Sequence, residues 1–202
     1  MTSYRKSFLI AFAIAPTLSL SCVSAEESKT TAYEATDLSG WKVPDNNIWW
    51  IAEEGILKVR SGPEKKGSIL WSEKEFKDFT VDLEFKFISG VIDSGVHLRN
   101  MDQIQIGISG SLKRDMTASP YIKGKGYPVE AEGVAELLKH DDWNQMRIEV
   151  TGKDYVCHLN GKKVMTYTSE GAIDKGPIGL QLHAGKEMSI DFKNIKVVEK
   201  VE

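Results

Sequence analysis

Four polar side chains are the strongest candidates for chemistry in this sequence: Glu84, His97, Arg99 and His183. Each stands in a run where apolar and polar residues alternate, so its apolar neighbours turn inward and it turns outward. An imidazole can take or give a proton near neutral pH, and a guanidinium is a permanently charged multiple donor. We therefore predict that these four side chains share one outward-facing groove in which acid–base chemistry can occur.

Amides and aromatic rings on other segments extend this inventory. The same alternation places Gln103, Gln105 and Gln181 outward, and Trp71 and Tyr121 are aromatic candidates for contact with a ligand. Sugars need many fixed donors and acceptors, so this set suits a polyhydroxylated ligand. The alternative is that the amides are only solvated surface residues and that Trp71 belongs to the core.

Short alternating runs, separated by glycine or polar clusters, must position these side chains. The clearest run is Phe79–Phe87, whose odd-numbered residues are all apolar. Similar runs predict further strands at residues 55–60, 67–72, 94–99, 103–108, 144–151, 154–160, 162–168, 178–183 and 188–198. Many short strands without alternating helices exclude a parallel α/β fold and predict an antiparallel sandwich or barrel.

Three connections between these runs carry their own signals. Asn160 and Gly161 predict a tight hairpin turn, because both residues tolerate a positive φ. Residues 131–140 predict a short helix that Gly133 interrupts. Residues 110–133 are rich in Gly, Lys and Ser and predict a long loop, and loops of that length are usually functional or mobile.

The first 25 residues predict a secretory signal peptide. A basic start is followed by an apolar stretch and by Val23-Ser24-Ala25 as a small-residue cleavage site. The apolar stretch is too short for a transmembrane segment, and no later stretch predicts one. We expect an exported protein, periplasmic or secreted, with a disordered segment at residues 26–36 and a single domain over residues 37–200. Lipoprotein anchoring through Cys22 is the less favoured alternative, because Ser19 stands where an apolar residue is usual.

Charge and cysteine content exclude several classes of partner and site. The chain has 26 Lys and Arg against 29 Asp and Glu, a formal net charge of −3. Removal of the leader, with Arg5 and Lys6, lowers this charge to −5, which argues against nucleic acid as the main partner. Cys157 then remains alone, which excludes an internal disulfide and a zinc site built from cysteines.

Several short motifs follow one another along the chain in an informative order. They are Asp37-Leu38-Ser39-Gly40-Trp41, Ser94-Gly95-Val96-His97-Leu98-Arg99, Gly176-Pro177-Ile178-Gly179-Leu180-Gln181-Leu182-His183 and the segments 77–85, 143–148, 159–161 and 192–195. In this order they resemble the 3-keto-disaccharide hydrolase family, also described as 3-keto-glucoside lyase/hydratase domains, over about residues 37–198. The resemblance implies an exported bacterial protein with a concanavalin A-like jelly-roll β-sandwich, in agreement with the all-β strand pattern.

The resemblance also implies an enzyme that acts on 3-keto-glycosides. A keto group at C3 acidifies the hydrogen on C2, so a base can remove that proton and the glycosidic oxygen on C1 leaves by β-elimination. Addition of water then makes the net reaction a hydrolysis. This path needs a base, a stabiliser of the enolate oxygen and an acid for the leaving group. By resemblance the base would be His97, His183 or Glu84, and Arg99 would stabilise the enolate.

Gln103 is the residue that keeps functions other than catalysis open. Gln103 stands where many relatives carry an acidic residue, and a neutral amide cannot act as a base. The alternatives are a non-catalytic carbohydrate-binding module of the same fold and an extracellular scaffold that exposes an apolar patch.

A divalent metal held by His and carboxylate groups would be able to assist catalysis, but the sequence contains no metal-spacing motif. Ser119-Pro120-Tyr121 also departs from the family pattern, so we expect a different substrate range.

Overall fold

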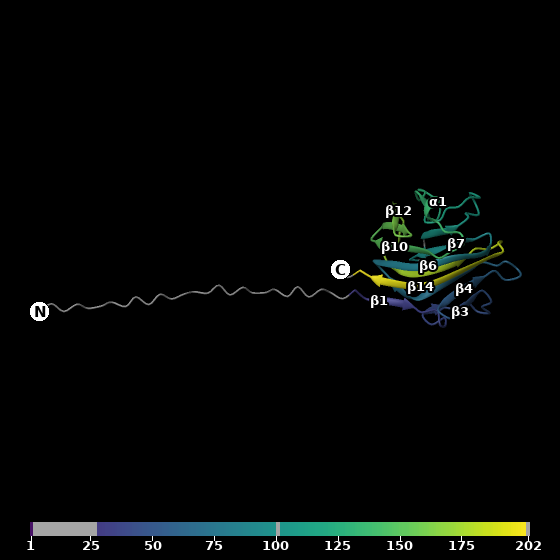
Figure 1. Cartoon of the computed structure of the whole chain (residues 1–202), viewed down its shortest axis with the longest axis horizontal. Coiled ribbons are helices and arrows are strands. Elements are labelled where there is room, and N and C mark those ends of the chain that lie inside the picture. Colours follow the sequence, from purple (N-terminus) through teal and green to yellow (C-terminus); the bar gives the residue numbers. More distant parts are fainter. Residues whose placement is uncertain (2–27, 100–101, 201–202) are drawn as a thin grey trace.

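The computed structural model describes Met1, residues 28–99 and residues 102–200. These residues form two antiparallel sheets packed as a jelly-roll sandwich, with strands β1 to β14 and the short helix α1 (Figure 1). The predicted all-β sandwich is confirmed. The predicted leader, including Cys22 but not Met1, lies outside the described residues. In the part of the chain that the structure describes, no helix is long and apolar enough to cross a membrane.

The larger sheet has β6 and β14 near its centre. Its order is β12-β11-β10-β6-β14-β4-β3, and β1 pairs with the C-terminal part of β14, which it accompanies in Figure 1. Its strands are β1 (Thr30–Tyr33), β3 (Trp50–Glu53), β4 (Ile56–Arg60), β6 (Phe79–Gly90), β10 (Asn144–Thr151), β11 (Asp154–Leu159), β12 (Lys162–Thr168) and β14 (Met188–Glu199).

The smaller sheet has the order β2-β5-β13-β7-β8-β9. Its strands are β2 (Trp41–Lys42), β5 (Ser68–Phe76), β7 (Asp93–Leu98), β8 (Asp102–Gly107), β9 (Pro120–Tyr121) and β13 (Gly176–Leu182). Successive side chains of a strand point to opposite faces, so every second residue of these strands belongs to the outer face of the sheet.

Apolar side chains from both sheets fill the space between them. Phe79, Val81, Leu83 and Phe85 of β6 are at most 3% exposed. The smaller sheet contributes the fully buried side chains of Leu70, Val96, Leu98, Ile104, Ile106, Ile178 and Leu180. Burial of these side chains drives folding and also fixes the register, because a slip of one residue would turn every one of them to solvent.

The connections follow the sequence in part. Asn160 has φ 49° and Gly161 has φ 82°, so the predicted hairpin turn is confirmed. The predicted helix is shorter than its sequence pattern, because α1 (Val134–Leu137) begins after Gly133, which has φ 66°. The segment predicted as a long loop contains β9 and a bridge between Ile108 and Asp115, so pairing with the sheet orders part of it.

The prediction that residues 26–36 are disordered is wrong for residues 30–33. These residues form β1, whose register pairs Tyr33 with Ile195 of β14. The Tyr33 side chain is 5% exposed, and its ring centroid lies 4.3 Å from that of Trp41. Four residues are too few for alternation to distinguish a strand from an extended tail.

Candidate functional site

Seven of the nine predicted site residues lie on the smaller sheet or at its edge. One row of neighbouring residues crosses the sheet from β5 to β9. In order, it consists of Trp71, Gly179, His97, Gln103 and Tyr121. The next row places Gln181 and Gln105 on either side of Gly95. His183 follows the end of β13. The predicted outward direction of these side chains therefore brings together residues from five strands.

Two glycines in these rows make room for larger side chains to lie flat on the sheet. A Cβ at Gly95 would stand 2.1 Å from Nε2 of Gln103, and a Cβ at Gly179 would stand 2.5 Å from the Trp71 ring. Neither glycine has a positive φ, so the close approach of the neighbours and not the backbone conformation requires glycine.

The three glutamine side chains form a connected hydrogen-bond network. Nε2 of Gln103 donates to Oε1 of Gln105 and to Oε1 of Gln181, each over 3.0 Å. Nε2 of Gln105 donates to Oδ1 of Asp93 over 2.9 Å. A carboxylate only accepts, so Asp93 fixes the direction of the Gln105 amide and, through it, that of Gln103. The network holds donors and acceptors in fixed positions.

Asp93 is the buried end of this network and sits next to His183. Its side chain is 3% exposed, and its Oδ2 has no hydrogen-bond partner among the described residues. Nδ1 of His183 lies 3.8 Å from this oxygen and 2.8 Å from the carbonyl oxygen of Ala184. A carbonyl only accepts, so Nδ1 carries the proton and Nε2 keeps a free lone pair. The pair therefore places a proton acceptor beside a buried negative charge.

These residues surround one pocket of about 400 Å³, which we call the amide pocket. The Tyr127 ring stands edge-on to Tyr121 with centroids 5.2 Å apart, and burial raises the pKa of the Tyr127 hydroxyl, which therefore stays protonated as a donor. The pocket is lined by Asp93, Gln103, Gln105, Ser109, Gly110, Ser111, Lys113, Tyr121, Tyr127, Gln181, His183 and Lys186.

His97 lies beside this pocket but does not line it. Its ring packs against Trp71 with centroids 5.2 Å apart, and both ring nitrogens are buried without a hydrogen-bond partner among the described residues. Burial lowers the pKa of His97 to about 4. The imidazole is therefore neutral near pH 7 and supports the Trp71 ring.

Arg99 does not reach the amide pocket, so the prediction that it shares the groove is wrong. β7 ends at Leu98, and Arg99 has φ 54°, which breaks the alternation on which the prediction rested. The residue is 1% exposed. Its guanidinium donates to the backbone carbonyls of Lys77, Gly152 and Ile173 and to the Asp78 carboxylate. These contacts tie separate connections together and leave Arg99 no access to a ligand in the pocket.

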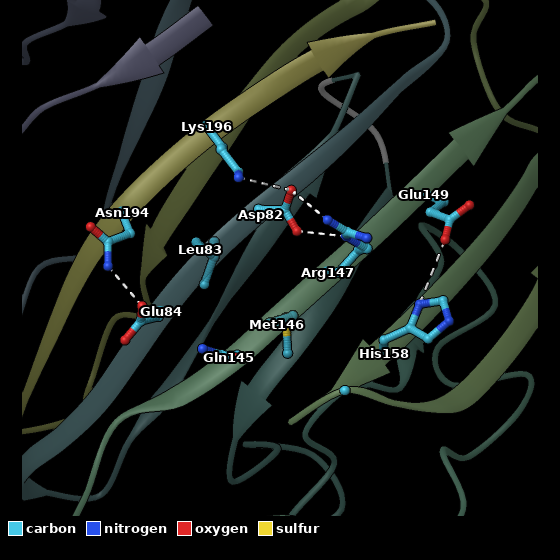
Figure 2. A pocket seen from close by; sticks show the side chains of 11 residues that line it. Asp82, Leu83, Glu84, Gln145, Met146, Arg147, Glu149, His158, Asn194 and Lys196 are labelled. Atoms are coloured by element: carbon cyan, nitrogen blue, oxygen red, sulfur yellow. Dashed lines mark hydrogen bonds and ion pairs between the residues drawn. The ribbon is translucent and has the colours of Figure 1, made fainter. Parts of the chain in front are cut away.

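Glu84 turns outward as predicted, but it lies on the larger sheet. The prediction that Glu84 shares a groove with the two histidines is therefore wrong. It lines a second pocket, of about 550 Å³, on the outer face of the larger sheet, which we call the ion-pair pocket (Figure 2). Figure 2 shows Asp82 between Arg147 and Lys196 and shows Glu84 facing Asn194. The Asp82 carboxylate lies 2.6 Å from Nε of Arg147 and 3.9 Å from Nζ of Lys196, and Nδ2 of Asn194 donates to Oε1 of Glu84 over 2.7 Å. Alternation assigns a residue to an inner or outer face but does not say to which sheet.

Sequence reasoning missed seven of the twelve residues that line the amide pocket, among them Asp93, Tyr127 and Lys113. Asp93 has the same parity as Gly95 and His97, and this signal was available in the sequence. Tyr127 and Lys113 come from the connection between β8 and α1, where no periodicity indicates direction. A loop residue reaches a site through tertiary packing, which a local pattern does not encode.

The residues of the amide pocket do not form a metal centre. Among the described residues, no group of three or more His, Cys, Asp and Glu side chains is placed to hold a metal ion. Asp93 and His183 would provide two ligands, and Nδ1 of His183 is engaged with a carbonyl.

Comparison with protein families gives one match. The profile described as the 3-keto-alpha-glucoside-1,2-lyase-like domain matches residues 29–198, which confirms the resemblance seen in the sequence motifs. No curated protein matches the chain.

Several solved structures share the fold. Two candidate glycosyl hydrolases from Parabacteroides distasonis align with 22% and 21% identity and TM-scores of 0.62 and 0.64. Each alignment covers 85% of this chain, and they cover 100% and 84% of the respective relatives. The Crh5 transglycosylase in complex with NAG aligns with 13% identity and a TM-score of 0.57, over 86% of this chain and 84% of its own. At these identities the likeness establishes the fold alone.

Proposed function

The chain belongs to the 3-keto-alpha-glucoside-1,2-lyase-like domain family, and on that premise we propose that it is an enzyme that cleaves 3-keto-glycosides in the amide pocket. The observation that carries the proposal is the Asp93–His183 pair, in which a buried carboxylate oxygen without a hydrogen-bond partner among the described residues lies 3.8 Å from an imidazole nitrogen. An unsatisfied buried polar atom is costly to folding, by about 1–3 kcal/mol, and a role in catalysis is one reason for a protein to keep such an atom.

His183 has the geometry of the base. Its side chain is 45% exposed in the pocket, and the Nδ1 contact to the Ala184 carbonyl leaves the Nε2 lone pair free. Nε2 takes the proton from C2 of the sugar, and the electrons of the C2–H bond form the enolate. The negative charge of Asp93 stabilises the imidazolium that results.

Tyr127 and the amides provide the donors that the developing charge needs. The Tyr127 hydroxyl, kept protonated by burial, donates to the enolate oxygen at C3. The enolate then re-forms the carbonyl as the bond from C1 to the glycosidic oxygen breaks, and the imidazolium of His183 returns its proton to that oxygen. Water adds across the C1–C2 double bond, with hydroxyl on C1 and hydrogen on C2, which completes a net hydrolysis.

The amide network would bind the hydroxyl groups of the sugar, and Trp71 and Tyr121 would offer apolar ring faces near it. Sugars are recognised by such fixed donors and acceptors together with aromatic contacts. These features would also serve a carbohydrate-binding module without activity, the second candidate, and Gln103 as a neutral amide is the observation that favours it. Export through the predicted leader remains part of the proposal.

A paired-substrate assay separates the two functions. The purified domain is incubated with an aryl 3-keto-glucoside and with the parent aryl glucoside, each with and without a chelator, and release of the aglycone is followed. We expect release from the keto-glucoside alone, unchanged by the chelator, because the parent lacks the acidified C2 hydrogen. Binding of both compounds without release above background would establish the binding module instead.

A further inference from the structure

The amide pocket carries a charge opposite in sign to that of the whole chain. Asp93 is the one acidic residue among its described lining residues, and Lys113 and Lys186 add two positive charges. The chain as a whole has a formal net charge of −3. A cationic site on an acidic protein attracts anionic ligands selectively, because the rest of the surface repels them.

Neither of these two ammonium groups has a carboxylate partner among the described residues. Nearby Lys65 is paired with Glu187 at 3.4 Å, and on the opposite face of the molecule Lys196 is paired with Asp82 at 3.9 Å. Lys186 is half-buried and Lys113 is exposed, so both can reach a ligand at the mouth of the pocket. Asp93 lies deeper and is held by Gln105.

The backbone at Lys113 adds an independent observation. Lys113 has φ 58°, in the left-handed region that glycine adopts more easily than lysine. The turn around it is tightly bonded, since its N–H donates to the carbonyl oxygen of Ser109 and the N–H of Ser109 donates to that of Arg114. Residues in such conformations cluster at ligand-binding sites.

We propose that the amide pocket takes glycosides that carry an anionic group, a carboxylate or a sulfate, and that Lys113 and Lys186 pair with this group at the mouth of the pocket. The inference rests on the proposed function, because it takes the pocket as the sugar site. In this arrangement the anion stays away from the buried Asp93, while the sugar hydroxyls reach the amides.

Binding of unoxidised sugars tests the inference without any turnover. The affinities of methyl glucoside, methyl glucuronide and methyl glucoside 6-sulfate are measured by calorimetry or NMR titration at low and high salt. We expect the domain to prefer one or both anionic sugars about 5-fold to 10-fold at low salt, and this preference to shrink at high salt. The two anionic arms show whether carboxylate or sulfate is the better fit.

Matched variants assign the preference to the two lysines. Lys113→Gly combined with Lys186→Gln should abolish the preference, so that the anionic sugars bind no more tightly than methyl glucoside. Lys113→Gly should fold at least as stably as the wild type because glycine tolerates this φ. Lys162→Gln, on the distant strand β12, is the control and should keep the preference. Equal affinities, no binding of any sugar, or a preference that survives the double variant would overturn the inference. The keto-glucoside assay is read separately and decides the proposed function.

Discussion

The outer faces of the two sheets each carry a polar pocket, and the two pockets differ in how their carboxylates are satisfied. In the ion-pair pocket, the carboxylate of Asp82 pairs with Arg147 and Lys196, although Nδ1 of His158, 3.7 Å from Glu149, is buried without a hydrogen-bond partner among the described residues (Figure 2). In the amide pocket, Asp93 keeps an oxygen without a partner among the described residues. The ion-pair pocket is the larger, at about 550 Å³ against 400 Å³.

This difference shows that size and polarity alone do not identify a site. Surface ion pairs neutralise one another and contribute little, about 0–1 kcal/mol each. A buried group that folding leaves unsatisfied is different, because a ligand can supply the missing partner. Equivalent substitutions are therefore expected to lower turnover on the face of the amide pocket and to leave it nearly unchanged on the other face.

The largest difference is expected between the two histidines that line these pockets. His183→Ala should lower kcat on a 3-keto-glucoside by about 100-fold to 10,000-fold, the usual contribution of a positioned base. His158→Ala, the matched change in the ion-pair pocket, should leave kcat within about 2-fold, because nothing in the mechanism uses that face. Equal losses of kcat in both variants, or unchanged kcat in His183→Ala, would contradict the claim that only the amide pocket takes part in catalysis.

A second difference concerns stability against pH. His97 has a pKa of about 4 in the folded protein and an ordinary value of 6.5 when unfolded. Between these values the unfolded chain binds a proton that the folded chain does not, so the free energy of unfolding falls as the pH drops from about 6.5 to 4. The loss is at most about 3 kcal/mol.

Urea unfolding of the wild type and of His97→Gln across pH 4–7 measures this contribution. The variant should lack this part of the pH dependence, whereas His158→Gln should keep it. The contrary result is a difference in the free energy of unfolding, between the wild type and His97→Gln, that does not change with pH. It would show that the His97 imidazole is not shielded from water.

A smaller effect is expected from a methyl group placed beside Asp93. A Cβ at Gly110 would stand 2.9 Å from Oδ2 of Asp93 and 3.9 Å from Cε1 of His183, and Gly110 has no positive φ. Gly110→Ala should therefore fold normally but displace the carboxylate, lowering kcat about 10-fold, the equivalent of 1.4 kcal/mol. Gly171→Ala, which meets open space, is the control. Full activity in Gly110→Ala would mean that the position of Oδ2 has no bearing on turnover.

The smallest effect is expected when an ion pair of the other face is broken. Arg147 is half-exposed and bonds Asp82 through Nε over 2.6 Å. Arg147→Gln should change the free energy of unfolding by less than about 1 kcal/mol and leave turnover unchanged, because solvent screens exposed pairs. Thermal melts measure the change in stability, and the keto-glucoside assay measures turnover. A loss of activity in Arg147→Gln would show that the larger sheet, and not the smaller one, carries the active site.

The fold was largely predictable because its strands are buried on one face. The patterns at residues 144–151 and 162–168 gave β10 and β12 with their observed bounds. The strands missed were β1, β2, β3 and β9, which are four residues long or shorter. In such short segments pairing with a neighbour, and not a local pattern, decides the conformation.

The candidate site was predictable only as far as alternation reaches. Gln103, Gln105 and Gln181 were placed on the correct face, but alternation failed for Arg99, where a positive φ ends the strand. Alternation also could not show that Glu84 and the two histidines lie on different sheets, because the assignment of a strand to a sheet depends on topology. Tyr127 and Lys113 come from a connection whose path is set by contacts distant in sequence.

The most direct test replaces the Asp93 carboxylate, whose Oδ2 has no hydrogen-bond partner in the described part of the chain. Asp93→Asn keeps the shape of the side chain and removes its charge, and its effect is read as kcat on a 3-keto-glucoside and as affinity for the unoxidised glucoside. The account predicts that kcat falls about 100-fold or more while the affinity changes by less than about 3-fold, as expected for a group that acts on the transition state. Wild-type kcat in Asp93→Asn would contradict the claim that this pair carries the reaction.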